Sequence, residues 1–253
     1  MQLTPMTFLI VCPLVFLAGL VDAIGGGGGL ISLPAYLLAG LPAHTAIATN
    51  KMSSACGTTV ATARLIKNGM VNFRLAAPAV AAAICGSSIG ARLSLRISES
   101  VMMKMMIVIL PVCAFLVMNR KLFNDSGADK VMLNRKTVIT ALVSAFLVGI
   151  YDGFYGPGTG TFLVIAFTVV ARLNLTTANA QAKIINLTTN LTALTVFFLH
   201  GEVLIPLGLA AAACNMLGGY LGIGLMMKNG SKIVRPSILI VLALLLIKIV
   251  TGM

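Results

Sequence analysis

Long runs of apolar residues are the feature that most limits how this chain can fold. Most are about 17 to 25 residues long, and a helix needs about 20 residues to cross the 30 Å hydrocarbon core of a bilayer. Charged residues make up only 9% of the sequence, against about a quarter in soluble domains, so a soluble enzyme is excluded. The chain is therefore predicted to be an all-α polytopic membrane protein. The apolar segments are 6–24, 28–40, 44–66, 75–96, 101–118, 137–155, 159–171, 177–199, 203–227 and 233–250.

Lysine and arginine dominate the few charges. The sequence has 18 basic and 6 acidic residues and a formal net charge of +12, which in a soluble protein would indicate nucleic-acid binding. Here the basic residues lie mostly in short loops between apolar segments, where they orient helices in the membrane. We therefore expect no nucleic-acid partner. The five cysteines lie in apolar runs without metal-ligand spacing, so neither a disulfide nor a metal site is expected.

The second half of the sequence repeats the first. The pattern Phe-Leu-x-Gly-x-x-Asp ends at Asp22 and again at Asp152, and with a slightly longer offset Lys51 recurs as Lys183. Several glycines recur in the same way, so we infer an internal duplication with about five apolar segments in each copy. The inferred units are an N-terminal transmembrane repeat, a cytoplasmic linker and a C-terminal transmembrane repeat, at 1–118, 119–136 and 137–253.

Loop charge predicts how the two repeats are oriented. Loops 64–74, 119–136 and 228–235 are rich in basic residues, which is typical of the cytoplasmic side. The loop equivalent to 64–74 carries only Glu202. Equivalent loops would then lie on opposite sides of the membrane, as in inverted repeats, with both termini outside. The mixed charge of loop 96–104 argues against this assignment, because it holds an acid between two bases.

Two segments, 28–40 and 159–171, are shorter than the others, and each follows a glycine-rich break. About 13 residues give roughly 20 Å of helix, so the sequence leaves open whether they span the membrane or re-enter it. Paired short segments of this kind indicate the substrate site of a transporter. The N–H groups that open a helix after such a break favour anions, and no Gly-Lys-Ser/Thr follows to form a nucleotide-binding loop. The substrate-binding residues expected here are Gly26, Gly27, Gly28, Gly29, Gly156, Gly158, Thr159 and Gly160.

Asp22 and Asp152 are the only two acidic residues inside apolar segments. Ionisable groups at membrane depth are costly and are usually functional, so both are candidates for a proton-coupling or gating carboxylate. Alternatively, each caps or braces a broken helix or pairs with a lysine. The sequence does not separate these two roles.

Each repeat carries a lysine, Lys51 or Lys183, at the head of a polar stripe with helical spacing. Such stripes also hold membrane helices together, but a lysine at the head of both favours an anion site. Lys183 is the stronger candidate of the two. The polar residues expected to contact the substrate with these lysines are Asn50, Ser54, Gln181, Asn186 and Asn190, and Thr58 continues the first stripe.

Both glycine motifs resemble one known family. The stretch from Phe16 to Gly29, followed by Pro34, and its echo from Gly149 to Gly160 are similar to the TauE/SafE sulfite exporters, also called the 4-toluene sulfonate uptake permeases. The resemblance covers essentially the whole chain. It implies a substrate of the sulfite or organosulfonate class, whereas the residues by themselves indicate only a small anion.

The sequence therefore predicts a secondary transporter that moves a small sulfur-containing anion across the cell (inner or plasma) membrane by alternating access. The alternatives are a permease for another small anion such as a carboxylate, or a membrane enzyme or assembly protein that does not transport. No nucleophile–base pair or metal cluster supports an enzyme, and no cofactor is expected. The expected partners are the substrate anion and the lipid bilayer, with a homodimer as an option.

Overall fold

The structure is a computed structural model that describes residues 3–105, 108–109 and 134–229, and its long elements are all helices. The predicted all-α fold is confirmed, and most helix ends lie within about two residues of the apolar segments. The expected segment 233–250 and most of segment 101–118 and of the linker 119–136 lie outside the described residues. The elements are α1 (Pro5–Gly25), α2 (Gly29–Leu38), α3 (Ala43–Lys67), α4 (Phe73–Ser94), α6 (Arg135–Phe154), α7 (Thr159–Ile165), the π-helical turn η2 (Ala166–Val170), α8 (Leu175–Leu199) and α9 (Ile205–Asn229).

Several helices begin where the sequence supplies a polar side chain to accept a free N–H group. Asn72, Asn134 and Asn174 accept the backbone N–H three residues ahead, at 3.2, 2.8 and 2.7 Å. Thr4 does the same for α1, directly before Pro5. These caps satisfy donors that a helix start leaves unpaired, which explains why α1, α4, α6 and α8 begin at these residues.

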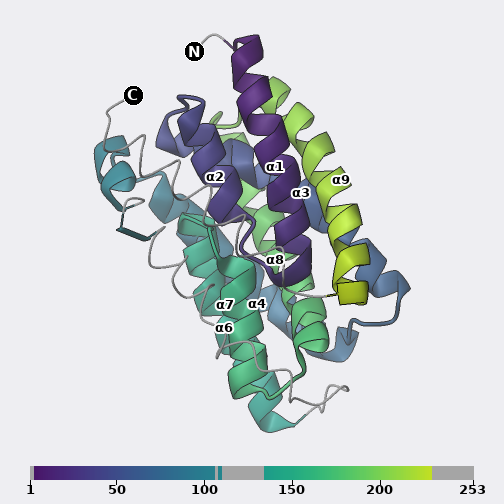
Figure 1. Ribbon diagram of the computed structural model, residues 1–253. Coiled ribbons are helices and arrows are strands. Elements are labelled where there is room, and N and C mark those ends of the chain that lie inside the picture. Colours follow the sequence, from purple (N-terminus) through teal and green to yellow (C-terminus); the bar gives the residue numbers. More distant parts are fainter. Residues whose placement is uncertain (1–2, 106–107, 110–133, 230–253) are drawn as a thin grey trace.

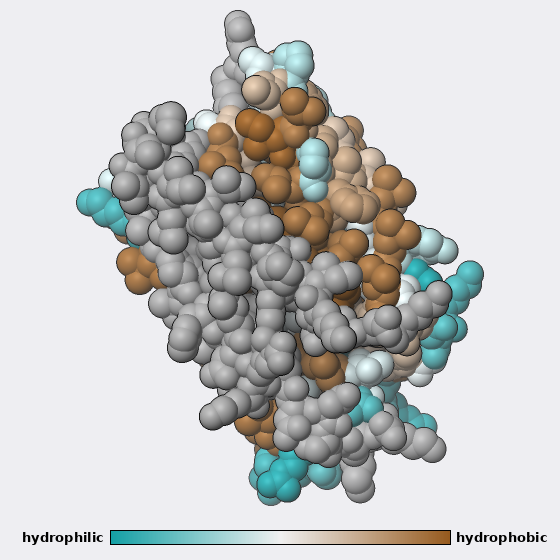
Figure 2. All heavy atoms as spheres, viewed as in Figure 1, coloured by the Kyte–Doolittle hydropathy of each residue, from teal (hydrophilic) through white to brown (hydrophobic). Residues whose placement is uncertain are grey.

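Within the described residues, five helices are long and apolar enough to cross a membrane: α1, α4, α6, α8 and α9. They carry many exposed large apolar side chains, of which Leu9 is 70% exposed. Figure 2 shows the brown apolar surface that results over α1 and its neighbours, with hydrophilic side chains gathered toward the ends. This is the surface that lipid chains cover. The chain is a multi-pass membrane protein.

Helix packing does not follow the two sequence repeats. Among the described residues, the fourth helix of each repeat lies with the other repeat, since α9 packs along α1 and α3, and α4 packs along α6 and α8 (Figure 1). We call the two resulting groups the α1 body (α1, α2, α3 and α9) and the α6 body (α4, α6, α7 and α8). The main contact between the bodies is between α3 and α8.

Glycines allow the exchanged helices to approach closely. A methyl group on Gly86 would collide with the carbonyl oxygen of Phe146 on α6, and one on Gly218 would collide with that of Phe16 on α1. The two collisions are equivalent in the repeats. Small residues that let helix backbones meet are the usual means of packing helices in a membrane, so these glycines determine which helices share a body.

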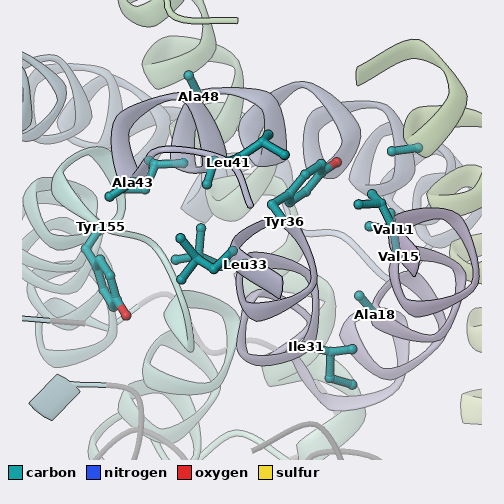
Figure 3. Packing of buried hydrophobic residues seen from close by; sticks show 14 of the residues in the cluster. Val11, Val15, Ala18, Ile31, Leu33, Tyr36, Leu41, Ala43, Ala48 and Tyr155 are labelled. Carbon is teal, nitrogen blue, oxygen red and sulfur yellow. The ribbon is translucent and has the colours of Figure 1, made fainter. Parts of the chain in front are cut away.

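The short helix α2 is buried inside the α1 body. Figure 3 shows Leu33 and Tyr36 of α2 packed among side chains of α1 and of the start of α3. The Tyr36 hydroxyl donates to Ser53 Oγ at 2.9 Å. With 10 residues in α2 and 7 in α7, neither helix reaches across 30 Å by itself, as the glycine breaks predicted.

Candidate functional site

The two glycine breaks touch each other where the bodies meet. α1 ends at Gly25, and Gly26 has a φ of +77°, a left-handed conformation that favours glycine. A Cβ atom on Gly26 would lie 2.5 Å from the carbonyl carbon of Gly160 and from the amide nitrogen of Thr161. A Cβ atom on Gly29 would lie 2.9 Å from the Cα atom of Pro157. Glycine is therefore required here both by conformation and by space.

Two ion pairs join the bodies around these breaks, one of them fully buried and the other with a partly exposed aspartate. Lys51 Nζ on α3 lies 2.8 Å from Asp152 Oδ2 on α6, and both side chains are only 2% exposed. Lys183 Nζ on α8 lies 2.5 Å from Asp22 Oδ2 on α1. Each repeat thus supplies the lysine for the other repeat's aspartate. This is the lysine-pairing role that the sequence left as one alternative for both acids.

Each aspartate also contacts the start of the short helix that follows it. Asp22 Oδ1 accepts the N–H of Gly28 at 3.4 Å, and Asp152 Oδ1 accepts the hydroxyl of Thr159 at 2.6 Å. Thr159 Oγ1 also lies 2.7 Å from the carbonyl oxygen of Gly156. The carboxylates therefore hold the starts of α2 and α7 in place, in addition to pairing with the lysines.

A polar cavity lies between these groups. Asn190 Oδ1 accepts from Lys51 Nζ at 3.2 Å, and Asn190 Nδ2 donates to Asn186 Oδ1 at 3.2 Å. Ser54 donates to Asn50 Oδ1 at 3.4 Å. The lining residues come from both bodies: Ala18, Asp22, Gly27, Gly28, Gly29, Asn50, Lys51, Ser54, Thr58, Asp152, Gly156, Gly158, Thr159, Gly160, Asn186, Asn190 and Asn215.

Most of the residues singled out in the sequence meet in this cavity, but three do not line it. Gly26 packs against Gly160 next to the cavity. Lys183 lies behind Asp22 and also donates to the Asp22 backbone oxygen. Gln181 is buried elsewhere on α8, and neither of its amide atoms has a hydrogen-bond partner within the described part of the chain. The cavity wall therefore carries Lys51 rather than Lys183, which the sequence favoured.

Asn215 is a lining residue that the sequence analysis missed. It lies on α9, is 5% exposed, and fits against Gly19 of α1 and Gly57 of α3, where a Cβ would collide with it. A signal was present, because Asn215 is the only asparagine in the apolar segment 203–227. Its position in the second repeat has no polar equivalent in the first, so a comparison of the two repeats does not reveal it.

The two histidines lie away from the cavity. His44 at the start of α3 contacts Glu99 Oε2 through Nδ1 at 2.7 Å, and His200 follows the end of α8. Among the residues that the structure describes, no group of three histidine, cysteine or acidic side chains could hold a metal ion.

Comparison with known proteins identifies the family of the chain. A family model described as "Sulfite exporter TauE/SafE" matches residues 11–249. A probable membrane transporter protein of Haemophilus influenzae is 34% identical over 236 residues, which are 93% of this chain and 91% of the relative. The probable membrane transporter protein YfcA of Escherichia coli K12 is also 34% identical, over 92% of this chain and 86% of the relative. No solved structure gives a significant match. The chain therefore belongs to the TauE/SafE sulfite exporter family and is a membrane transporter.

Proposed function

We propose that this transporter carries a small sulfur-containing anion, of the sulfite or organosulfonate type, across the cell membrane by alternating access. The observation that carries the proposal is the position of Lys51, a buried ammonium group at the wall of a cavity where two broken helices meet. Paired broken helices at the interface of two repeats are typical of substrate sites in secondary transporters.

An anion that leaves water for this cavity must replace its hydration shell. Lys51 supplies a positive charge, and the amide groups of Asn50, Asn186 and Asn215 supply hydrogen-bond donors. The oxygens around the sulfur atom of a sulfonate or of sulfite accept several such hydrogen bonds at once. The TauE/SafE description of the family favours sulfur oxyanions over carboxylates, which the same donors would also accept.

Alternating access would come from movement of the α1 body against the α6 body. The cavity and both ion pairs lie between these bodies, whereas α1 with α9 and α4 with α6 are joined by close glycine contacts. The moving units in this proposal are therefore the two bodies rather than the two sequence repeats.

Transport by purified protein in liposomes tests the substrate class. Liposomes loaded with unlabelled sulfite or methanesulfonate should take up the same labelled anion by exchange, and acetate should compete weakly. Glu202→Gln, which removes an acid outside the cavity, serves as a matched control. Exchange of the sulfur anions no faster than in liposomes without protein would contradict the proposal. Faster exchange of acetate than of either sulfur anion would favour the carboxylate alternative.

A further inference from the structure

We propose that the two ion pairs have different roles: Lys51 binds the substrate anion while Asp152 takes up a proton, and Lys183–Asp22 remains paired throughout. This inference rests on the proposed function, because it requires an anion in the cavity. Three observations separate the two pairs, which would be equivalent if the repeats were identical.

The lysines differ in what they face. Lys51 Nζ lies at the cavity wall and contacts Asn190 Oδ1 as well as Asp152. Lys183 does not line the cavity, and its Nζ donates to both the side chain and the backbone oxygen of Asp22. An entering anion therefore reaches Lys51 and competes with Asp152 for it, while Lys183 keeps its partner.

Asp152 has a neighbour that can satisfy either of its protonation states. The single hydroxyl hydrogen of Thr159 has two acceptors, Asp152 Oδ1 at 2.6 Å and the carbonyl oxygen of Gly156 at 2.7 Å. When Asp152 is ionised, Thr159 donates to it. When Asp152 carries a proton on Oδ1, the acid donates to Thr159 Oγ1, and the hydroxyl turns its hydrogen to Gly156.

Asp22 has no such neighbour among the described residues. Its Oδ1 accepts the N–H of Gly28, and its Oδ2 accepts from Lys183. Both partners are donors only, so neither can accept a proton from Asp22. Asp22 is 20% exposed at the cavity and has, within the described part of the chain, no hydrogen-bond partner that serves both of its protonation states, whereas the buried Asp152 has Thr159.

The charged groups around Asp152 define the proton step. Lys51 of α3 is its direct partner, and Asp22 of α1 with Lys183 of α8 lies across the cavity. From α7 the contact is Thr159, and α4 faces this part of α6 with Ser87, next to Gly153.

When an anion binds Lys51, Asp152 would be left as a second, unpaired negative charge beside it. Asp152 then accepts a proton from water on the open side and releases it on the other side as the anion leaves, so one proton and one anion cross together without net charge.

Anion flux into liposomes that contain the full chain tests whether the two ion pairs have these different roles. Methanesulfonate is the solute, because its sulfonate stays ionised at every pH used. An inward gradient of two pH units, with the membrane potential clamped at zero, should drive accumulation of up to about hundredfold for one proton per anion, tenfold per unit. Exchange at equal pH is measured in parallel, since exchange needs only the loaded carrier and reports on the substrate site itself.

Asp152→Asn imitates the protonated acid, so it should lower accumulation by a far larger factor than exchange. Thr159→Val removes the hydroxyl but keeps the shape; because Thr159 also lines the cavity, exchange should fall somewhat, and accumulation should fall by a larger factor. The double variant Asp22→Asn/Lys183→Gln removes the other pair without leaving an unpaired charge, and it should still respond to the gradient. Glu202→Gln should behave as the wild type in both assays.

Three results would overturn the inference while the proposed function stands: wild-type exchange without a response to the gradient, full accumulation by Asp152→Asn, or loss of the response in the Asp22/Lys183 double variant with exchange intact. Absence of methanesulfonate exchange by the wild type would instead refute the proposed function, and this inference would fall with it.

Discussion

Lys51 and Asp152 come from different sequence repeats and from different bodies of the fold, yet Lys51 Nζ lies 2.8 Å from Asp152 Oδ2 with both side chains buried. Lys183 and Asp22 repeat the relationship in the opposite sense. Two ion pairs therefore tie the bodies together around the cavity. Because each positive charge is already balanced, an anion that binds a lysine competes with its carboxylate, and this competition determines the expected effects of substitutions at the four residues.

Removing one partner of the Lys183–Asp22 pair should destabilise the protein strongly. Asp22→Asn leaves the Lys183 ammonium buried without a countercharge, which costs about 3–5 kcal/mol. For a chain of this size the corresponding fall in Tm is roughly 6–20 °C. Thermal unfolding of the purified variants in detergent measures it. The double variant Asp22→Asn/Lys183→Gln should recover most of the loss, and a double variant no more stable than Asp22→Asn would show that the pair is not coupled.

Substrate affinity should depend on Lys51 far more than on Lys183. A charge-assisted hydrogen bond contributes about 1.5–3 kcal/mol, so Lys51→Gln should weaken sulfite binding by roughly tenfold to a hundredfold. Lys183→Gln should mainly lower Tm, because Asp22 then has no countercharge. Lys67→Gln, an exposed lysine at the end of α3, is the matched control. Binding measured by calorimetry would argue against this cavity if Lys51→Gln bound sulfite as tightly as Lys67→Gln.

Alanine at Gly26 and at Gly40 tests the need for glycine where the breaks touch. Both glycines have positive φ, +77° and +84°, and at Gly26 a ψ of 179° adds a conformation that essentially only glycine adopts. A Cβ at Gly26 would collide with Gly160, whereas at Gly40 nothing lies within 4 Å. Arg172, at the position equivalent to Gly40, adopts a φ of +55° with a full side chain.

We therefore expect Gly40→Ala to cost only the strain of a left-handed residue, about 1 kcal/mol or slightly more, and to leave transport intact. Gly26→Ala should lower Tm further and slow exchange sharply, because its backbone conformation disfavours any side chain and because the two breaks are pushed apart. Equal Tm values and equal exchange rates for the two variants would mean that the breaks do not need to touch.

The helices and the members of the site were largely predictable from the sequence. Apolar runs predicted α1, α3, α8 and other helices, because a segment that spans hydrocarbon must satisfy its backbone hydrogen bonds internally, as a helix does. Repeated Gly, Asp and Lys residues gave most of the cavity lining, since a duplicated fold brings equivalent positions to one centre. The short helices α2 and α7 followed from the glycine breaks before them.

The partners of these residues were not predictable in the same way. The repeat alignment shows that Lys51 and Lys183 are equivalent, but not that each pairs with the aspartate of the other repeat. That pairing depends on which helix surfaces meet, and small contacts such as Gly86 against the Phe146 carbonyl decide it. Asn215 was not predictable for a related reason. It occurs in only one repeat, and its place in the cavity wall depends on the space that Gly19 and Gly57 leave for its side chain.

The inverted orientation of the repeats remains a prediction from loop charge, and labelling can decide it. Asn68 follows α3 and Glu202 follows α8, so they occupy equivalent connections, and Glu202 avoids the strain of a side chain on Gly201, whose φ is +75°. Single cysteines are introduced at 68 or 202 in a variant whose five native cysteines are replaced by alanine or serine. If basic loops face the cytoplasm, a membrane-impermeant maleimide applied to intact cells should label position 202 and spare position 68, with both labelled after the cells are opened. Labelling of both positions in intact cells, or of neither, would place the two connections on the same side and refute the inverted arrangement.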